Sequence, residues 1–259
     1  MSFFSRITWQ RVPVRAMRIA QPQREARFWL AFCVLFFFAS ILTGWVMRTW
    51  RMPFLGAASL TQDVTYIFFF KLFLLLSVPL VAFRRMGYRV ADLTPGWRLG
   101  VRSFTPLVVG YALGFAINLG HLKWQSAARA NFAEPEFWAR VAFGPVLAFL
   151  MAGFPEEFVF RGLLQTRLEA VRGRTVAIFT TAILFTAWHI PPRYFNATGV
   201  EGEAGNLVSV LLGTGAPVFI VGLIFGLIWD RYRSFWPLVA AHTGVDTLPI
   251  ISSLLGIPR

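Results

Sequence analysis

Seven apolar runs divide this chain, and each is long enough to cross the hydrocarbon core of a membrane as a helix. About 20 helical residues span the roughly 30 Å of hydrocarbon. The runs cover residues 28–47, 64–83, 103–120, 141–166, 175–190, 206–229 and 235–256. Because backbone polar groups in lipid must be satisfied within the segment itself, the runs predict an all-α, polytopic transmembrane helix bundle.

The sixth run contains three residues that interrupt helices, namely Gly213, Gly215 and Pro217. They could split the run into a short re-entrant piece over residues 206–212 and a spanning helix that begins at Pro217. The bundle would then have eight membrane segments in place of seven. The sequence leaves both counts open.

The composition supports an integral membrane protein, because 56% of the residues are hydrophobic and only 14% are charged. The net charge of +13 is also a property of nucleic-acid-binding proteins. Here, however, the arginines lie in short segments that flank the apolar runs and form no single basic patch. We therefore expect membrane lipids as partners and no nucleic acid.

The distribution of basic residues predicts the orientation. If the N-terminus is cytoplasmic, sixteen arginines fall in inside segments, and only seven arginine or lysine residues fall in outside segments. Cytoplasmic loops carry the excess of Arg and Lys in membrane proteins. We therefore expect a cytoplasmic N-terminus and place the protein in the inner or plasma membrane of the cell.

Intramembrane charge is distributed unevenly. The first three runs contain only Lys71, whereas the fourth, fifth and last contain all the other ionisable residues within the runs. We divide the chain into a basic cytoplasmic arm (1–27), N-terminal transmembrane helices for packing and anchoring (28–136), and a helical working core that carries the other intramembrane charges (137–259). Lys71 is interpreted as a residue that snorkels to the interface or donates a hydrogen bond between helices.

Two adjacent glutamates lie in the apolar segment GFPEEFVFRGLL. A charge inside a membrane costs on the order of 3 kcal/mol, so such residues usually face a protein cavity and have a function. Glu157 and Arg161 are four residues apart, which predicts an ion pair on one helix face. Glu156 is rotated by about 100° and has no such partner in its own helix. It is therefore the candidate general base.

Two further apolar runs each present a pair of residues at the same spacing. Phe185 and His189 lie in the fifth run, and His242 and Asp246 lie in the last. Residues four apart share a helix face. Together with Glu156, these imidazoles and carboxylates are the groups expected to activate a water molecule.

In chain order these pairs form the motifs EExxxR, FxxxH and HxxxN/D. They resemble the CPBP (CAAX protease and bacteriocin-processing) intramembrane proteases, which include the type II CAAX prenyl endopeptidases, over roughly residues 143–255. The resemblance implies a helix bundle with a conical intramembrane cavity, in which Glu156 is the base and His189 its partner. It also implies that His242 and Asp246 stabilise the oxyanion or complete a metal site. We expect Glu157, Arg161 and Phe185 to support these four residues.

The resemblance therefore predicts a glutamic or metallo-type endopeptidase that hydrolyses a membrane-associated or lipidated protein or peptide. Its four candidate residues, Glu156, His189, His242 and Asp246, match the N and O ligands preferred by a divalent metal such as zinc. They come from three helices without the local spacing of zinc-protease motifs. We therefore favour chemistry without a metal.

Two other classes of function stay open. Glu156, His189 and Asp246 could form the relay of a proton-coupled transporter, although the internal repeats typical of transporters are absent from the sequence. The chain could also be a non-catalytic binding or immunity protein on the same scaffold. The GxxxG pairs at Gly110 and Gly114 and at Gly222 and Gly226 are expected to be close-packing helix faces.

Overall fold

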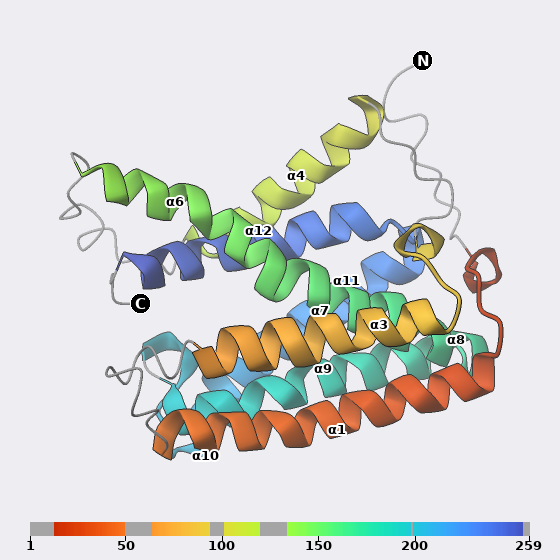
Figure 1. Cartoon of the computed structure of the whole chain (residues 1–259), viewed down its shortest axis with the longest axis horizontal. Coiled ribbons are helices and arrows are strands. Elements are labelled where there is room, and N and C mark those ends of the chain that lie inside the picture. The colour runs from red at the N-terminus through yellow and green to blue at the C-terminus, as the bar shows by residue number, and fades with distance from the viewer. Residues whose placement is uncertain (1–12, 50–63, 94–100, 120–133, 198, 256–259) are drawn as a thin grey trace.

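The computed structural model describes residues 13–49, 64–93, 101–119, 134–197 and 199–255. Within these ranges all regular structure is helical, and the helices pack side by side and across one another as a bundle (Figure 1). The predicted all-α polytopic fold is therefore confirmed. Among the described residues, the helices that are long and apolar enough to cross a membrane are Pro22–Thr49, Tyr66–Arg85, Pro135–Arg172, Arg174–Asn196 and Leu207–Tyr232.

The N-terminal part of the bundle contains a long helix, a second apolar helix that packs beside it, and a shorter apolar helix. Its elements are η2 (Val14–Ala16), α1 (Pro22–Thr49), η4 (Val64–Ser77), α3 (Val78–Arg85), η5 (Val90–Leu93) and α4 (Val101–Ile117). The helix α1 begins at Pro22, so the last six residues of the predicted arm over 1–27 are already helical. Residues 1–12 of that arm lie outside the described residues.

The C-terminal part begins with one continuous helix, Pro135–Arg172, which changes its winding along its length. Its elements are α6 (Pro135–Ala148), η7 (Phe149–Gly153), α7 (Phe154–Glu156), η8 (Glu157–Gln165) and α8 (Thr166–Arg172). The stretches η7 and η8 are π-type, a winding that often occurs at functional sites. Glu156 and Glu157 lie where α7 passes into η8.

Four more segments complete this part. They are α9 (Arg174–Asn196), with η9 (Gly199–Glu201) after it, the run α10 (Leu207–Val210), η10 (Leu211–Gly215) and α11 (Ala216–Tyr232), and finally α12 (Phe235–Leu254). The sixth apolar run is one helix from Leu207 to Tyr232, so the break required for eight segments does not form. Gly213 and Gly215 lie in the π-type stretch η10, and Pro217 lies in the first turn of α11.

Glycines allow the helices that carry the site to approach closely. A Cβ atom at Gly153 in η7 would lie 2.9 Å from the carbonyl oxygen of Val239 and 3.0 Å from the amide nitrogen of Thr243, both in α12. Gly114 makes a similar approach from α4, where a Cβ would lie 3.0 Å from the amide nitrogen of Val245. The predicted close-packing role of Gly114 is therefore confirmed, and α12 is held between α4 and the helix that bears Glu156.

Aromatic packing fixes α1, η4 and α9 relative to one another. The rings of Phe36 and Phe70 stack at a centroid distance of 4.5 Å, and Trp188 lies 5.4 Å from Phe36 and 5.9 Å from Phe70. All three side chains are buried. Figure 1 shows α1, α3 and α9 running alongside one another. The helices α4, α6 and α12 lie above them in this view, with α4 and α6 oblique to α12. In the same bundle η4 packs against α7, and α9 packs against η8.

Candidate active site

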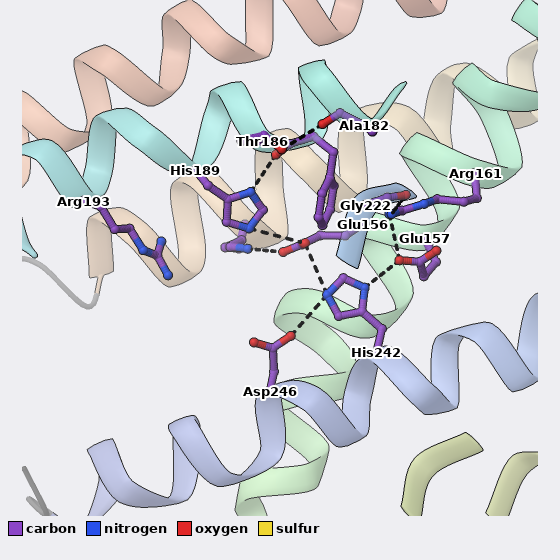
Figure 2. A network of polar contacts seen from close by, with 12 residues as sticks. Glu156, Glu157, Arg161, Ala182, Thr186, His189, Arg193, Gly222, His242 and Asp246 are labelled. Atoms are coloured by element: carbon purple, nitrogen blue, oxygen red, sulfur yellow. Dashed lines mark hydrogen bonds and ion pairs between the residues drawn. The ribbon is translucent and has the colours of Figure 1, made fainter. Parts of the chain in front are cut away.

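The three predicted motifs meet in one buried cluster between α7, α9 and α12 (Figure 2). Glu156 ends α7, His189 lies in α9, and His242 and Asp246 lie one turn apart on α12. Glu156 is 1% exposed, and both histidines are buried. Asp246 is the most open of the four, with 32% of its side chain exposed. Helix packing therefore brings together residues up to 90 positions apart in the sequence.

The two carboxylate oxygens of Glu156 have different surroundings. Oε1 forms an ion pair with Nζ of Lys71, which comes from η4. Oε2 is buried and has no hydrogen-bond partner among the described residues. It faces Nε2 of His242 at 3.5 Å and Nε2 of His189 at 3.9 Å. One oxygen is thus held by a cation, and the other is presented to two imidazoles.

His189 is oriented by the backbone of its own helix. Its Nδ1 lies 2.7 Å from the carbonyl oxygen of Phe185, which can only accept a hydrogen bond. Nδ1 therefore carries the proton, and in the neutral imidazole Nε2 carries the lone pair. The four-residue spacing of FxxxH thus fixes the ring so that its basic nitrogen points at Glu156.

His242 is held by carboxylates on both sides of its ring. Its Nδ1 lies 2.6 Å from Oε1 of Glu157, and its Nε2 lies 3.2 Å from Oδ2 of Asp246. Ionised carboxylates only accept hydrogen bonds, so this arrangement suits an imidazolium that donates from both nitrogens. The N–H at Nε2 is directed at the space between Asp246 and Glu156.

The predicted ion pair between Glu157 and Arg161 is present, with Nη1 of Arg161 2.9 Å from Oε1 of Glu157. Arg161 also donates through Nη2 to the carbonyl oxygen of Gly222 at 3.3 Å. Glu157 has a second function that the sequence did not indicate, because the same Oε1 contacts His242. A partner on another helix leaves no spacing signal in the sequence.

Phe185 packs against three members of the site. Its ring centroid lies 4.8 Å from that of His189 and 6.0 Å from that of His242. The guanidinium carbon of Arg161 lies 4.4 Å from the same ring, a distance typical of a cation–π contact. The phenyl ring therefore packs edge-on against both imidazoles.

Lys71 corrects one interpretation made from the sequence. It does not snorkel, because it is 4% exposed and pairs with Glu156 inside the bundle. The alternative, an interhelical contact, is present as an ion pair. The signal in the sequence was a single charge in an otherwise uncharged span, but the sequence could not identify its partner. The site thus includes a residue from the part over 28–136 that we had interpreted as packing and anchoring.

The donor set does not fit a zinc ion held by the four candidate residues. A zinc-bound histidine needs an unprotonated nitrogen directed at the metal, yet both ring nitrogens of His242 face carboxylates. The ammonium of Lys71 already binds Oε1 of Glu156. Within the described ranges, no group of three or more His, Cys, Asp or Glu side chains has an arrangement that could hold a metal ion.

Comparison with known families agrees with this geometry. A family model described as type II CAAX prenyl endopeptidase Rce1-like matches residues 138–248. The matched region contains Glu156, His189, His242 and Asp246, and it ends before the last turn and a half of α12. Lys71 lies outside it. Neither a curated protein nor a solved structure matches the chain. The resemblance seen in the three motifs is therefore confirmed at the level of the family.

Proposed function

We propose that this integral membrane protein is an intramembrane endopeptidase, because a family model described as type II CAAX prenyl endopeptidase Rce1-like matches residues 138–248. Its substrate would be a membrane-associated or lipidated protein or peptide, with prenylated CAAX proteins as the class that the family description offers. The observation that carries the proposal is Oε2 of Glu156, which is buried, accepts no hydrogen bond from the described residues and faces two imidazoles.

The separation of Glu156 and His189 suits a bridging water. A water that donates hydrogen bonds of about 2.8 Å to both atoms can connect an oxygen and a nitrogen 3.9 Å apart. With Glu156 ionised and His189 neutral, Oε2 of Glu156 and Nε2 of His189 are both acceptors. The water would therefore donate one hydrogen bond to each of them. Its lone pair would then be free to point at a substrate carbonyl carbon.

Hydrolysis would begin when this water attacks the carbonyl carbon and gives one proton to Oε2 of Glu156. A carbon–oxygen bond forms, and the carbonyl becomes a tetrahedral oxyanion. Glu156 would then return the proton to the amide nitrogen as the carbon–nitrogen bond breaks. The products are a new carboxyl terminus and a free amine, so one water is consumed per bond.

His242 would stabilise the oxyanion with the N–H at Nε2, which would then be shared between the oxyanion and Oδ2 of Asp246. An oxyanion is best stabilised by donors that are already oriented in a site that excludes water. Glu157 and Asp246 hold the imidazolium in place from opposite sides. No step needs a metal, and we propose that the reaction proceeds without one.

The proposal is tested by the protein termini found in living cells. Protein termini would be compared in membranes from cells that express wild type, Glu156→Gln or Glu25→Gln at equal levels. Glu25 is a buried carboxylate outside the site, so its variant controls for general damage. We expect new carboxyl termini that depend on wild type and on Glu25→Gln and disappear with Glu156→Gln. Identical termini in all three cultures, with proton flux that depends on Glu156, would favour a transporter instead.

We also propose that the N-terminus is cytoplasmic and that the protein resides in the plasma or inner membrane. The excess of arginines in the predicted inside segments supports this orientation. A reporter fused after Arg172 should be active in the cytoplasm, and one fused after Glu201 should be active outside. An external signal after Arg172 would reverse the assignment.

A further inference from the structure

Lys71 is the one charged residue between positions 64 and 83, and it lies in the middle of η4 among phenylalanines and leucines. Its side chain is buried, so its ammonium does not reach the polar boundary of the membrane. Instead, Nζ pairs with Oε1 of Glu156. A buried charge is retained mainly where another group compensates it, and here that group is the candidate base itself.

Two aromatic rings fix the ammonium in place. Nζ of Lys71 lies 4.4 Å from the ring centroid of Trp188 and 5.6 Å from that of Tyr66. Both distances fall within the range of cation–π contacts. The indole of Trp188 also lies 3.8 Å from the ring centroid of His189. One buried ring therefore contacts both the cation and the imidazole that face Glu156, and it sets their relative positions.

The pairing distinguishes the two oxygens of Glu156. Lys71 occupies Oε1, so the carboxylate is rotated with Oε2 towards His189 and His242. A carboxylate without this partner could rotate or exchange its oxygens within the cluster. The ammonium also supplies positive charge beside a base that must be anionic to accept a proton in an apolar bundle.

We propose that Lys71 is a positioning residue for peptide hydrolysis. It holds Oε1 of Glu156 and thereby presents Oε2 to the attacking water; this role rests on the proposed peptidase function. Because Lys71 lies outside residues 138–248, the working site combines the family domain with a cation supplied by an earlier helix. The first transmembrane helices then contribute to catalysis as well as to anchoring.

The experiment replaces Lys71 in the full-length protein in lipid nanodiscs. Lys71→Met removes the charge but keeps an unbranched apolar side chain, and Lys71→Arg keeps the charge. The probe is a farnesylated CAAX-type peptide with a fluorophore and a quencher on either side of the scissile bond. We expect Lys71→Met to lower kcat about 100-fold with KM within about twofold of wild type. Lys71→Arg should restore part of the lost kcat, which a purely structural role for the side chain would not require.

A matched control removes a different buried cation. Arg167 pairs with Glu25 at 3.1 Å away from the site, so Arg167→Met should lower the midpoint of thermal unfolding but leave kcat unchanged. Stability gives a second, independent readout. Lys71→Met and Glu156→Gln each leave a charge unpaired, whereas the double variant removes both. The double variant should therefore unfold at a higher temperature than either single variant.

The outcomes separate this inference from the function on which it rests. The role of Lys71 would be overturned, and the proposed function would stand, if Lys71→Met kept the wild-type kcat. The same would follow if the double variant unfolded at no higher temperature than the single variants. Equal cleavage by wild type and Glu156→Gln, or none by wild type, would overturn the proposed function and the role of Lys71 with it.

Discussion

Two buried carboxylates in this protein, Glu25 and Glu156, are both paired with a cation from another helix, yet they differ in how completely they are bonded. Oε1 of Glu25 accepts hydrogen bonds from the hydroxyl of Tyr88 at 2.6 Å and from the backbone N–H of Gln21 at 2.9 Å. Its Oε2 accepts one from Nε of Arg167 at 3.1 Å. Both oxygens are therefore occupied.

The groups around Glu25 are themselves well bonded. The Tyr88 hydroxyl also accepts a hydrogen bond from the amide of Ala20 at 2.6 Å, and Arg167 donates to the carbonyl oxygen of Gly162 at 2.6 Å. Burial, together with the hydrogen bond to Glu25, raises the pKa of the Tyr88 phenol, so it stays protonated and continues to donate at neutral pH. This cluster ties the start of α1 to α8 and leaves neither oxygen of Glu25 without a hydrogen bond.

Glu156 differs because one of its oxygens is left without a hydrogen bond by the described residues. A buried acceptor without a partner costs about 1 to 3 kcal/mol. In a folded protein such a group usually binds a water, an ion or a ligand. We infer that Glu25 stabilises the fold and propose that Glu156 is the residue available for chemistry.

The largest effect is expected from Glu156→Gln. The amide cannot act as a base, so the cleavage rate per folded molecule should fall about 1,000-fold or more. The measurement is peptide cleavage by purified protein in nanodiscs, normalised to the folded fraction. If the cleavage rate fell by less than tenfold, the proposed difference in function between Glu25 and Glu156 would be wrong.

Glu25→Ala should have a large effect on stability and little effect on catalysis. It leaves Arg167 as an unpaired buried cation, which typically costs about 3 to 5 kcal/mol. Denaturation in mixed micelles would measure the free energy of unfolding, with cleavage assayed on the folded fraction. A catalytic defect in protein that is still folded would show that the two clusters are not independent.

Phe185→Leu should have an intermediate effect that sharpens the comparison. The backbone carbonyl that orients His189 is retained, but the ring that packs against both imidazoles is lost. We expect kcat to fall about tenfold through loss of orientation. Phe83→Leu is the control, because Phe83 is also fully buried but packs against Tyr88 and Phe158. Equal losses in both variants would assign the effect to packing in general.

The smallest effect is expected from metal removal. His242 faces carboxylates through both nitrogens, and Lys71 binds Glu156, so we expect chelator-treated protein to keep its activity within about twofold. Elemental analysis would verify that the metal is gone. Activity that disappears with the metal and returns in proportion to added zinc would contradict metal-free hydrolysis.

The sequence predicted the helical class and the position of most helices, because hydropathy alone determines where a chain can cross a membrane. A spacing of four also placed pairs such as His242 and Asp246 on one helix face, and the resemblance to the CPBP family implied that the three pairs form one site. The contacts of Lys71 with Glu156 and of Glu157 with His242 could not be predicted. They depend on how separate helices rotate and pack, and a single sequence does not contain that information.

Transfer of oxygen from water in a single turnover tests the central claim most directly. Excess wild-type protein would cleave the peptide in water enriched in the heavy oxygen isotope, and both the product and the Glu156-containing fragment would be analysed by mass spectrometry. If Oε2 of Glu156 activates the water, the new carboxyl terminus should carry a single heavy oxygen after the first turnover, and Glu156 should carry none. Heavy oxygen in Glu156, with an unlabelled first product, would show that the carboxylate attacks the peptide itself and would contradict the account.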